Sequence, residues 1–361
     1  MKPVMYFEKL DALRFFAFFL VIWQHAFSDI FHNITENSAL QTTIDTFTVT
    51  GGIGVQIFFV ISGFLITFLM LGEEKINGRV NLFFFYLRRV LRIWPLYYLV
   101  MILGIFVFPY FGGFFSFSGN KLMNLIFLNN MATSGTPSNV NVAWSVAIEE
   151  QFYLFWPLLF ILFQNKKLLF FFCAVLFIQT SIYAIETSGS EAYSSTFGNL
   201  RYLMIGCWGA FFYSNYKERI SASYLLKPSS FYLICFLGVF LLSASNFSIS
   251  YNYLAKWLLA IFYLYIVIYC VDKSTGEGGS IFSLLGKYTY GMYLYHPIIL
   301  VASYNIVDKL GYDYNKGDLL KLIMAIVTLL ATIGISILSY EYFEKPILKL
   351  KNKISTIQTR V

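Results

Sequence analysis

The sequence has 361 residues, of which 58% are hydrophobic and only 12% are charged. Soluble domains carry about 25% charged residues, so the composition excludes an ordinary soluble fold and indicates a polytopic membrane protein. The net charge of +7 does not indicate nucleic-acid binding, because the basic residues lie in short loops between apolar segments, the pattern that sets membrane topology.

Ten apolar windows are long enough to cross a bilayer as helices. If the N-terminus is cytoplasmic, the inner segments hold 19 lysines and arginines and the outer segments hold 6, with Arg14 just inside the first span. This bias predicts an all-α polytopic protein with about ten transmembrane helices and both termini in the cytoplasm. We expect residues 1–350 to form one integral-membrane domain and residues 351–361 to form a short basic cytoplasmic tail. The windows are 10–31, 47–71, 83–109, 144–163, 168–186, 198–213, 229–246, 251–271, 281–304 and 320–343.

The first window carries three ionisable residues on one face of an apolar helix. At about 100° per residue, Arg14 and His25 differ by roughly 20° in azimuth, and Asp11 lies on the same side. The face continues to Ser28 and His32. Ionisable groups within a span are costly and usually mark function, although a buried histidine bonded to a neighbouring helix is the alternative. The run is too long for a signal peptide and lacks a suitable cleavage site.

Small residues in the second window predict close helix packing. They are Gly51, Gly52, Gly54, Ser62 and Gly63.

The third window begins with three arginines, Arg88, Arg89 and Arg92, which can converge on one side of a helix. The planar guanidinium suits bidentate recognition of phosphate. We therefore expect this cytoplasmic entry to bind a phosphate-bearing ligand, the alternative being a membrane anchor of basic side chains.

The longest outer connection, residues 109–143, contains a short apolar piece at 122–128. That piece is too short to span a bilayer, which predicts an interfacial or re-entrant helix. Because long ordered loops are often functional, the connection is a candidate lid over an outer site.

The fourth window places two adjacent carboxylates, Glu149 and Glu150, in the outer half of the membrane. Ser145, Glu149 and Tyr153 share one helix face. Because the first and fourth spans run in opposite directions, His25 and Glu149 are predicted at comparable depth. A carboxylate beside an imidazole suits a general base, and a purely structural hydrogen bond is the alternative.

The remaining polar residues of the apolar windows are less informative. His296 precedes Pro297 within the ninth window, which predicts a kink and leaves a structural and a supporting catalytic role both open. Glu341 or Glu344 could pair with the cytoplasmic arginines. The four cysteines are typical of core positions, and the three histidines have no short ligand spacing, so we expect no metal site.

These motifs together resemble the acyltransferase family 3, the integral-membrane sugar O-acyltransferases. The resemblance covers the chain from the first span to the last. It is carried by LDALRFFAFFLVIWQHA, GVQIFFVISGFLIT, FYLRRVLRIWP, WSVAIEEQFYLFWP, YTYGMYLYHP and YFEKP. The resemblance implies a ten-helix domain that transfers an acyl group, commonly acetyl from acetyl-CoA, to a hydroxyl of an extracytoplasmic glycan or glycolipid.

Position by position, the resemblance implies that His25 is the family's essential histidine and that Arg14 is the arginine of the same motif. Glu149 matches the glutamate of the fourth-span pattern and is preferred over Glu150. Gln56 departs from the family, because many members have an acidic residue there.

The third span also matches, with Arg89 and Arg92 as the R-x-x-R pair and Arg88 as a common extra arginine. We expect no C-terminal hydrolase-like domain of the kind found in some members, which favours direct transfer to the acceptor.

The expected function is therefore membrane-embedded O-acetylation in the cell envelope. Acetyl-CoA or another acyl-CoA is the donor substrate, held by Arg14, Arg88, Arg89 and Arg92, with no permanently bound cofactor and no metal. His25, oriented by Glu149, either removes the acceptor proton or carries the acyl group transiently. Supporting roles are open to Asp11, Ser145, Glu150, Tyr153 and His296.

The expected location is a bacterial inner or cytoplasmic membrane, with membrane lipids, acyl-CoA and a glycan or glycolipid acceptor as partners and no nucleic acid. The alternatives are a glycolipid or solute transporter, which predicts inverted repeats that the sequence does not display, and a non-catalytic scaffold.

Overall fold

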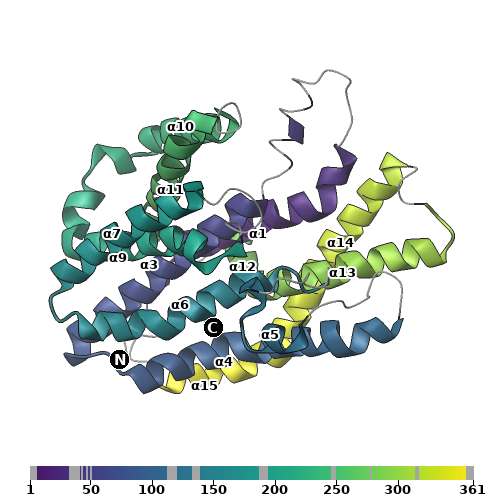
Figure 1. Cartoon of the computed structure of the whole chain (residues 1–361), viewed down its shortest axis with the longest axis horizontal. Helices are drawn as coiled ribbons and strands as arrows, with labels where there is room; N and C mark the ends of the chain where they lie inside the picture. The colour runs from purple at the N-terminus through teal and green to yellow at the C-terminus, as the bar shows by residue number, and fades with distance from the viewer. Residues whose placement is uncertain are drawn as a thin grey trace.

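The computed structural model describes a bundle of helices (Figure 1). The described residues are 6–31, 41, 44–45, 48, 51–111, 120–131, 139–186, 194–244, 249–276, 279–313 and 317–354. Every regular element in these residues is helical, which confirms the predicted all-α class. His32, the last residue of the predicted polar face of the first span, lies outside them.

Each of the ten predicted windows contains a long helix. The first window forms α1 (Glu8–Ile22) and continues through a π-helical turn, η1 (Trp23–Phe27), and the short helix η2 (Ser28–Ile30). The others form α3 (Gly51–Asn77), α4 (Leu82–Ile102), α6 (Ala143–Leu162), α7 (Lys166–Glu186), α9 (Thr196–Ser221), α10 (Pro228–Ala244), α11 (Ile249–Asp272), α13 (Thr289–Lys309) and α14 (Asp318–Ser339).

Six helices in the described residues are long and apolar enough to cross a membrane, so the chain is a multi-pass membrane protein. These six begin at Glu8, Gly51, Leu82, Ala143, Lys166 and Asp318. The total of ten crossings and the cytoplasmic position of both termini stay predictions. The ninth window is not one helix: it divides into α12 (Ile281–Gly286) and α13, because the chain turns at Lys287 and Tyr288.

Polar contacts group the predicted inner segments at one end of the bundle. Glu8 accepts hydrogen bonds from the backbone of Thr275 and Gly276, at 2.7 Å and 3.0 Å. Lys166 forms an ion pair with Glu74 at 3.2 Å. At the other end, Lys321 Nζ donates to the Asp29 carbonyl at 3.3 Å. These contacts join predicted inner segments to one another and predicted outer segments to one another.

The predicted short helix in the outer connection is α5 (Lys121–Leu125), whose N-terminus is capped by Asn120. It lies against α4, since the hydroxyls of Tyr97 and Tyr98 donate to the carbonyls of Asn124 and Leu125 at 2.6 Å and 3.1 Å. Residues 112–119 and 132–138 of this connection lie outside the described residues, and its role as a lid stays a prediction.

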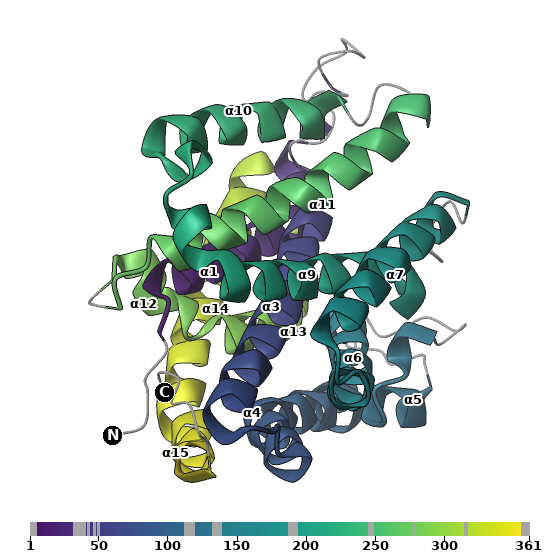
Figure 2. The same cartoon turned by 90° about the vertical axis from the view of Figure 1, so that its left-hand side faces the viewer.

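The chain ends in α15 (Lys345–Ile354), which follows α14 through the π-helical turn η9 (Tyr340–Glu344). Figures 1 and 2 both show α15 beside α4, the helix that carries the three arginines. The helix continues past residue 350, and Lys351 is 3% exposed, so the first residue of the predicted tail is a buried helical position.

Helix α3 crosses the middle of the bundle (Figure 2) and packs against α1 and α9. A side chain at Gly63 would meet the backbone of Leu203, and one at Gly206 would meet the backbone of Val60 and Phe64. At Gly54, an added Cβ would meet the backbone of Ala17. The interpretation of Gly54 and Gly63 as packing positions is confirmed, since small residues let helices approach closely in a membrane.

Substitution of Gly206 by Val is expected to destabilise the protein. The contacted atoms are backbone and cannot rotate away, and overpacking a tight contact costs about 1–3 kcal/mol or more. Gly334→Val is the matched control, because nothing lies within 4 Å of a Cβ at that position. Thermal unfolding in detergent micelles measures both variants, and an equal melting temperature for the two would contradict the packing.

Candidate active site

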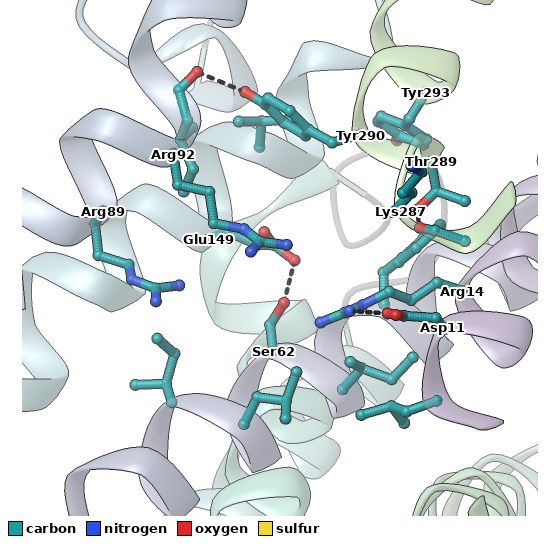
Figure 3. A pocket seen from close by; sticks show the side chains of 18 of the residues that line it. Asp11, Arg14, Ser62, Arg89, Arg92, Glu149, Lys287, Thr289, Tyr290 and Tyr293 are labelled. Atoms are coloured by element: carbon teal, nitrogen blue, oxygen red, sulfur yellow. Dashed lines mark hydrogen bonds and ion pairs between the residues drawn. The ribbon is translucent and has the colours of Figure 1, made fainter. Parts of the chain in front are cut away.

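A cavity of about 220 Å³ lies between α1, α3, α4, α6 and α13 and is also lined by residues of η9 and α15. Figure 3 shows Arg14, Arg89 and Arg92 directing their guanidinium groups toward it from two helices. The polar side chains that line it are those of Tyr6, Asp11, Arg14, Ser62, Arg89, Arg92, Ser145, Glu149, Tyr153, Lys287, Thr289, Tyr290, Tyr293, Tyr340 and Glu344.

The first two residues of the predicted face of the first span, Asp11 and Arg14, are part of this cavity. Arg14 Nη1 donates to Asp11 Oδ1 at 2.5 Å, one turn apart on α1. Asp11 is buried, and the ion pair offsets the cost of placing both charges within the bundle. Both residues line the cavity.

Two of the three arginines of α4, Arg89 and Arg92, line the cavity. The guanidinium carbon of Arg89 lies 5.7 Å from the centroid of the Tyr153 ring. The Nε atom of Arg89 is buried without a hydrogen-bond partner. Within the part of the chain that the structure describes, no carboxylate oxygen lies within ion-pair distance of either guanidinium. The cavity carboxylates Glu149 and Glu344 instead accept hydrogen bonds from hydroxyl groups.

The third arginine, Arg88, is turned away from the cavity, which corrects its placement with the donor-binding residues. Its Nη2 donates to Glu73 Oε2 at 2.7 Å. Glu73 Oε1 accepts from the backbone of Asn81, the N-cap of α4, at 3.1 Å. Consecutive residues point about 100° apart on a helix, so Arg88 joins α3 to α4 while Arg89 faces the cavity.

Glu149 lines the cavity, but its hydrogen bonds differ from those predicted. Its Oε1 accepts from Ser62 Oγ at 2.6 Å, and its Oε2 accepts from the Tyr153 hydroxyl at 3.2 Å. Glu150 faces another way and accepts from Trp94 Nε1 at 2.9 Å. The preference for Glu149 over Glu150 as the cavity carboxylate is therefore consistent with the geometry.

His25 forms its hydrogen bond with His296, not with Glu149. The distance between His25 Nδ1 and His296 Nε2 is 3.0 Å. The two rings are stacked, with their centroids 5.2 Å apart. His25 lies in the π-helical turn η1, a rare conformation that is frequent at functional sites. His25 is exposed, whereas His296 is completely buried on α13.

The prediction that His25 pairs with Glu149 is wrong. Helix direction alone does not reveal how far neighbouring helices are offset along their axes. Ser145 and Tyr293 are level, since their hydroxyls are 2.7 Å apart. From that level, Glu149 lies four residues toward one end of the bundle and His296 three residues toward the other. At 1.5 Å per residue this separates Glu149 from the histidines by about 10 Å along the axes.

Tyr293 lies between the cavity and the two histidines. Its side chain lines the cavity together with Ser145, and its ring packs edge-on against His296 at 5.9 Å. Its hydroxyl also lies 3.2 Å from the Val142 carbonyl. Neither Tyr293 nor Ser62 was assigned from the sequence: Ser62 was interpreted as a packing residue, and Tyr293 is one of several tyrosines in its segment with no distinguishing spacing.

Among the described residues, no group of three or more His, Cys, Asp or Glu side chains is placed to hold a metal ion. The site is therefore built from arginines, a carboxylate with two hydroxyl partners, and a histidine pair. Groups of this kind can bind an anion and accept a proton.

A family model described as an acyltransferase domain, that of acyltransferase family 3, matches residues 7–341, and the chain belongs to this family. The chain is 27% identical over 330 residues to the peptidoglycan O-acetyltransferase OatA of Listeria monocytogenes, covering 83% of this chain and 51% of the relative. It is also 27% identical over 377 residues to the putative peptidoglycan O-acetyltransferase YrhL of Bacillus subtilis, covering 95% of this chain and 55% of the relative.

The chain thus spans about half the length of these curated relatives. A further relative with the same identity is named as a putative O-acetyltransferase, SACOL0978, of Staphylococcus aureus, with 83% of this chain and 53% of that protein covered. No solved structure matches the chain.

Replacing Arg88 by Met is expected to lower stability, because it leaves the buried Glu73 carboxylate without its ion pair. Breaking one partner of a buried pair costs about 3–5 kcal/mol. The double variant Arg88→Met, Glu73→Gln removes both charges and should recover much of the loss. Thermal unfolding of the two single variants and the double variant measures the coupling, and additive losses would contradict the pairing.

Proposed function

We propose that this protein is a membrane-embedded O-acetyltransferase that transfers acetyl from cytoplasmic acetyl-CoA to a hydroxyl of an extracytoplasmic glycan. The observation that carries the proposal is the cavity in which Arg89 and Arg92 face the interior without a carboxylate partner in the described residues, close to a histidine pair. Membership of the acyltransferase family and the names of the relatives support it.

The arginines form the donor end of the proposed site. Two partly buried guanidinium groups without a direct ion pair among the described residues are costly in an apolar bundle, and a bound anion would offset that cost. The phosphates of CoA are such anions, and the arginine fork can hold a phosphate through two parallel hydrogen bonds. Arg14, already paired with Asp11, faces the same cavity and completes the basic lining.

The histidine end supplies the proton acceptor. His25 is exposed and has its Nδ1 engaged with His296, so its Nε2 is the nitrogen available to an acceptor hydroxyl. In the proposed reaction Nε2 takes the hydroxyl proton as the oxygen attacks the thioester carbonyl, and the C–S bond breaks to release CoA. A positioned base of this kind contributes typically 10²–10⁴-fold to the rate.

The acceptor class is inferred from the relatives. Two of them are named as peptidoglycan O-acetyltransferases, so we propose a cell-envelope polysaccharide or glycolipid, with peptidoglycan as the first substrate to test. The corresponding location is the bacterial cytoplasmic membrane, with the arginines toward the cytoplasm and His25 toward the outer face, as the loop charges predict.

Arg89→Lys is expected to weaken binding of acetyl-CoA about tenfold, because lysine keeps the charge but loses the second parallel hydrogen bond to phosphate. Arg88→Lys is the matched control: it is the adjacent arginine, and its ion pair with Glu73 lies outside the cavity. Calorimetric titration of acetyl-CoA into each variant in nanodiscs measures the difference. Equal affinities for the two variants would refute phosphate recognition by Arg89.

His25→Ala is expected to reduce glycan O-acetylation by at least 10²-fold, the usual contribution of a general base. The measurement is mass spectrometry of cell-envelope glycans from a deletion strain that carries either the wild-type or the variant gene, with membrane protein levels matched by immunoblot. Full acetylation at normal protein levels would overturn the assignment of His25.

A further inference from the structure

The hydrogen bonds around His296 determine which nitrogen of His25 carries its proton. His296 Nδ1 lies 3.2 Å from the carbonyl oxygen of Met292, one turn earlier on α13. A carbonyl oxygen can only accept a hydrogen bond, so Nδ1 of His296 carries the hydrogen and donates it. The position of this proton follows from chemistry, independently of how the two imidazoles meet.

The second nitrogen of His296 must then act as an acceptor. The ring is completely buried, and among the described residues no carboxylate lies within ion-pair distance of it. A buried charge without a counter-charge is costly, which favours a neutral imidazole with a lone pair on Nε2. The His25 Nδ1 atom, 3.0 Å away, is therefore the donor of the hydrogen bond between the rings.

We propose that His296 is a positioning residue that holds His25 in the Nδ1–H tautomer and keeps Nε2 of His25 unprotonated toward the acceptor. The inference rests on the proposed function, since it assigns the basic nitrogen of the proposed base. His296 touches no substrate in this account. It acts through His25, as the carboxylate or carbonyl partner of a catalytic histidine does elsewhere.

Packing fixes the orientation of the His296 ring as well as its hydrogen bonds. The rings of Phe18 and Tyr293 pack edge-on against the His296 ring, with centroid distances of 6.0 Å and 5.9 Å. Phe18 is fully buried on α1, the helix that continues into the turn holding His25. The same contacts that bury His296 therefore hold α1 against α13 and set the distance between the two imidazoles.

The direct test is the protonation pattern of the imidazole nitrogens by solid-state NMR of the full chain, labelled with ¹⁵N-histidine, in lipid vesicles. The chain has only three histidines, so His25→Ala and His296→Phe assign the signals by subtraction. In the wild type we expect His25 to show protonated Nδ1 and bare Nε2. In His296→Phe, which retains a ring of similar size but offers no acceptor, we expect the proton of His25 to redistribute toward Nε2.

A kinetic test separates positioning from a purely structural role. His296→Phe should lower kcat for acetyl transfer by about 10–100-fold, the usual effect of losing an orienting partner, with little change in KM for acetyl-CoA. His296→Gln places an amide oxygen near the position of Nε2 and should recover both the Nδ1–H tautomer and part of kcat. Melting temperatures of all variants verify that they are folded.

Two results would overturn the proposal: a wild-type His25 protonated on Nε2, or a folded His296→Gln variant no better than His296→Phe in tautomer and kcat. Failure of the proposed function gives a different result from these two. Full activity of His25→Ala would show that His25 is not the catalytic base, and it would leave the NMR measurement of the His25 tautomer unaffected.

Discussion

The need to satisfy polar groups within an apolar helical bundle determines the arrangement of this structure. Three pairs each give a partner to a polar side chain whose burial would otherwise cost free energy. They are Asp11 with Arg14, Glu73 with Arg88, and His25 with His296. Glu73 and Arg88 lie on helices joined by a turn, and His25 and His296 lie on elements distant in the sequence. The contacts that satisfy these polar groups therefore also position the helices. Arg89 and Arg92 differ because they face a cavity without a carboxylate partner among the described residues, and this is why the cavity is the natural place for an anionic ligand.

The cavity and the histidine pair are separate but adjacent parts of one site. Tyr293 belongs to both, because its side chain lines the cavity and its ring packs against His296. A donor held by the arginines would thus approach the histidines past Tyr293 and Ser145, whose hydroxyls are hydrogen-bonded to each other. This arrangement fits a protein that takes a phosphate-bearing donor from one side of a membrane and delivers its acyl group at the other. It fits less well with a transporter, which needs no proton acceptor at the end of the path.

Residue type and spacing predicted much of the fold and part of the site. Apolar length located a helix in each of the ten windows, since it depends on local sequence. The helix face shared by Asp11 and Arg14 and the face shared by Ser145, Glu149 and Tyr153 were also predictable from periodicity, and all five residues line the cavity. The partner of His25 was not, because a helical pattern fixes a side chain's direction on its own helix but not which neighbouring helix it meets. Arg88 was misplaced for a related reason: its buried partner, Glu73, lies at the far end of the preceding helix, where nothing in the spacing marks it.

We propose that one path through the protein joins the arginine-lined cavity to His25 across the membrane. The most direct test of this proposal uses proteoliposomes of uniform orientation, with radiolabelled acetyl-CoA supplied only on the side of Arg89 and a soluble peptidoglycan fragment only on the side of His25. The account predicts labelled acetyl ester on the fragment, and none from His25→Ala vesicles. Labelled product that forms only when donor and acceptor share one compartment would contradict it.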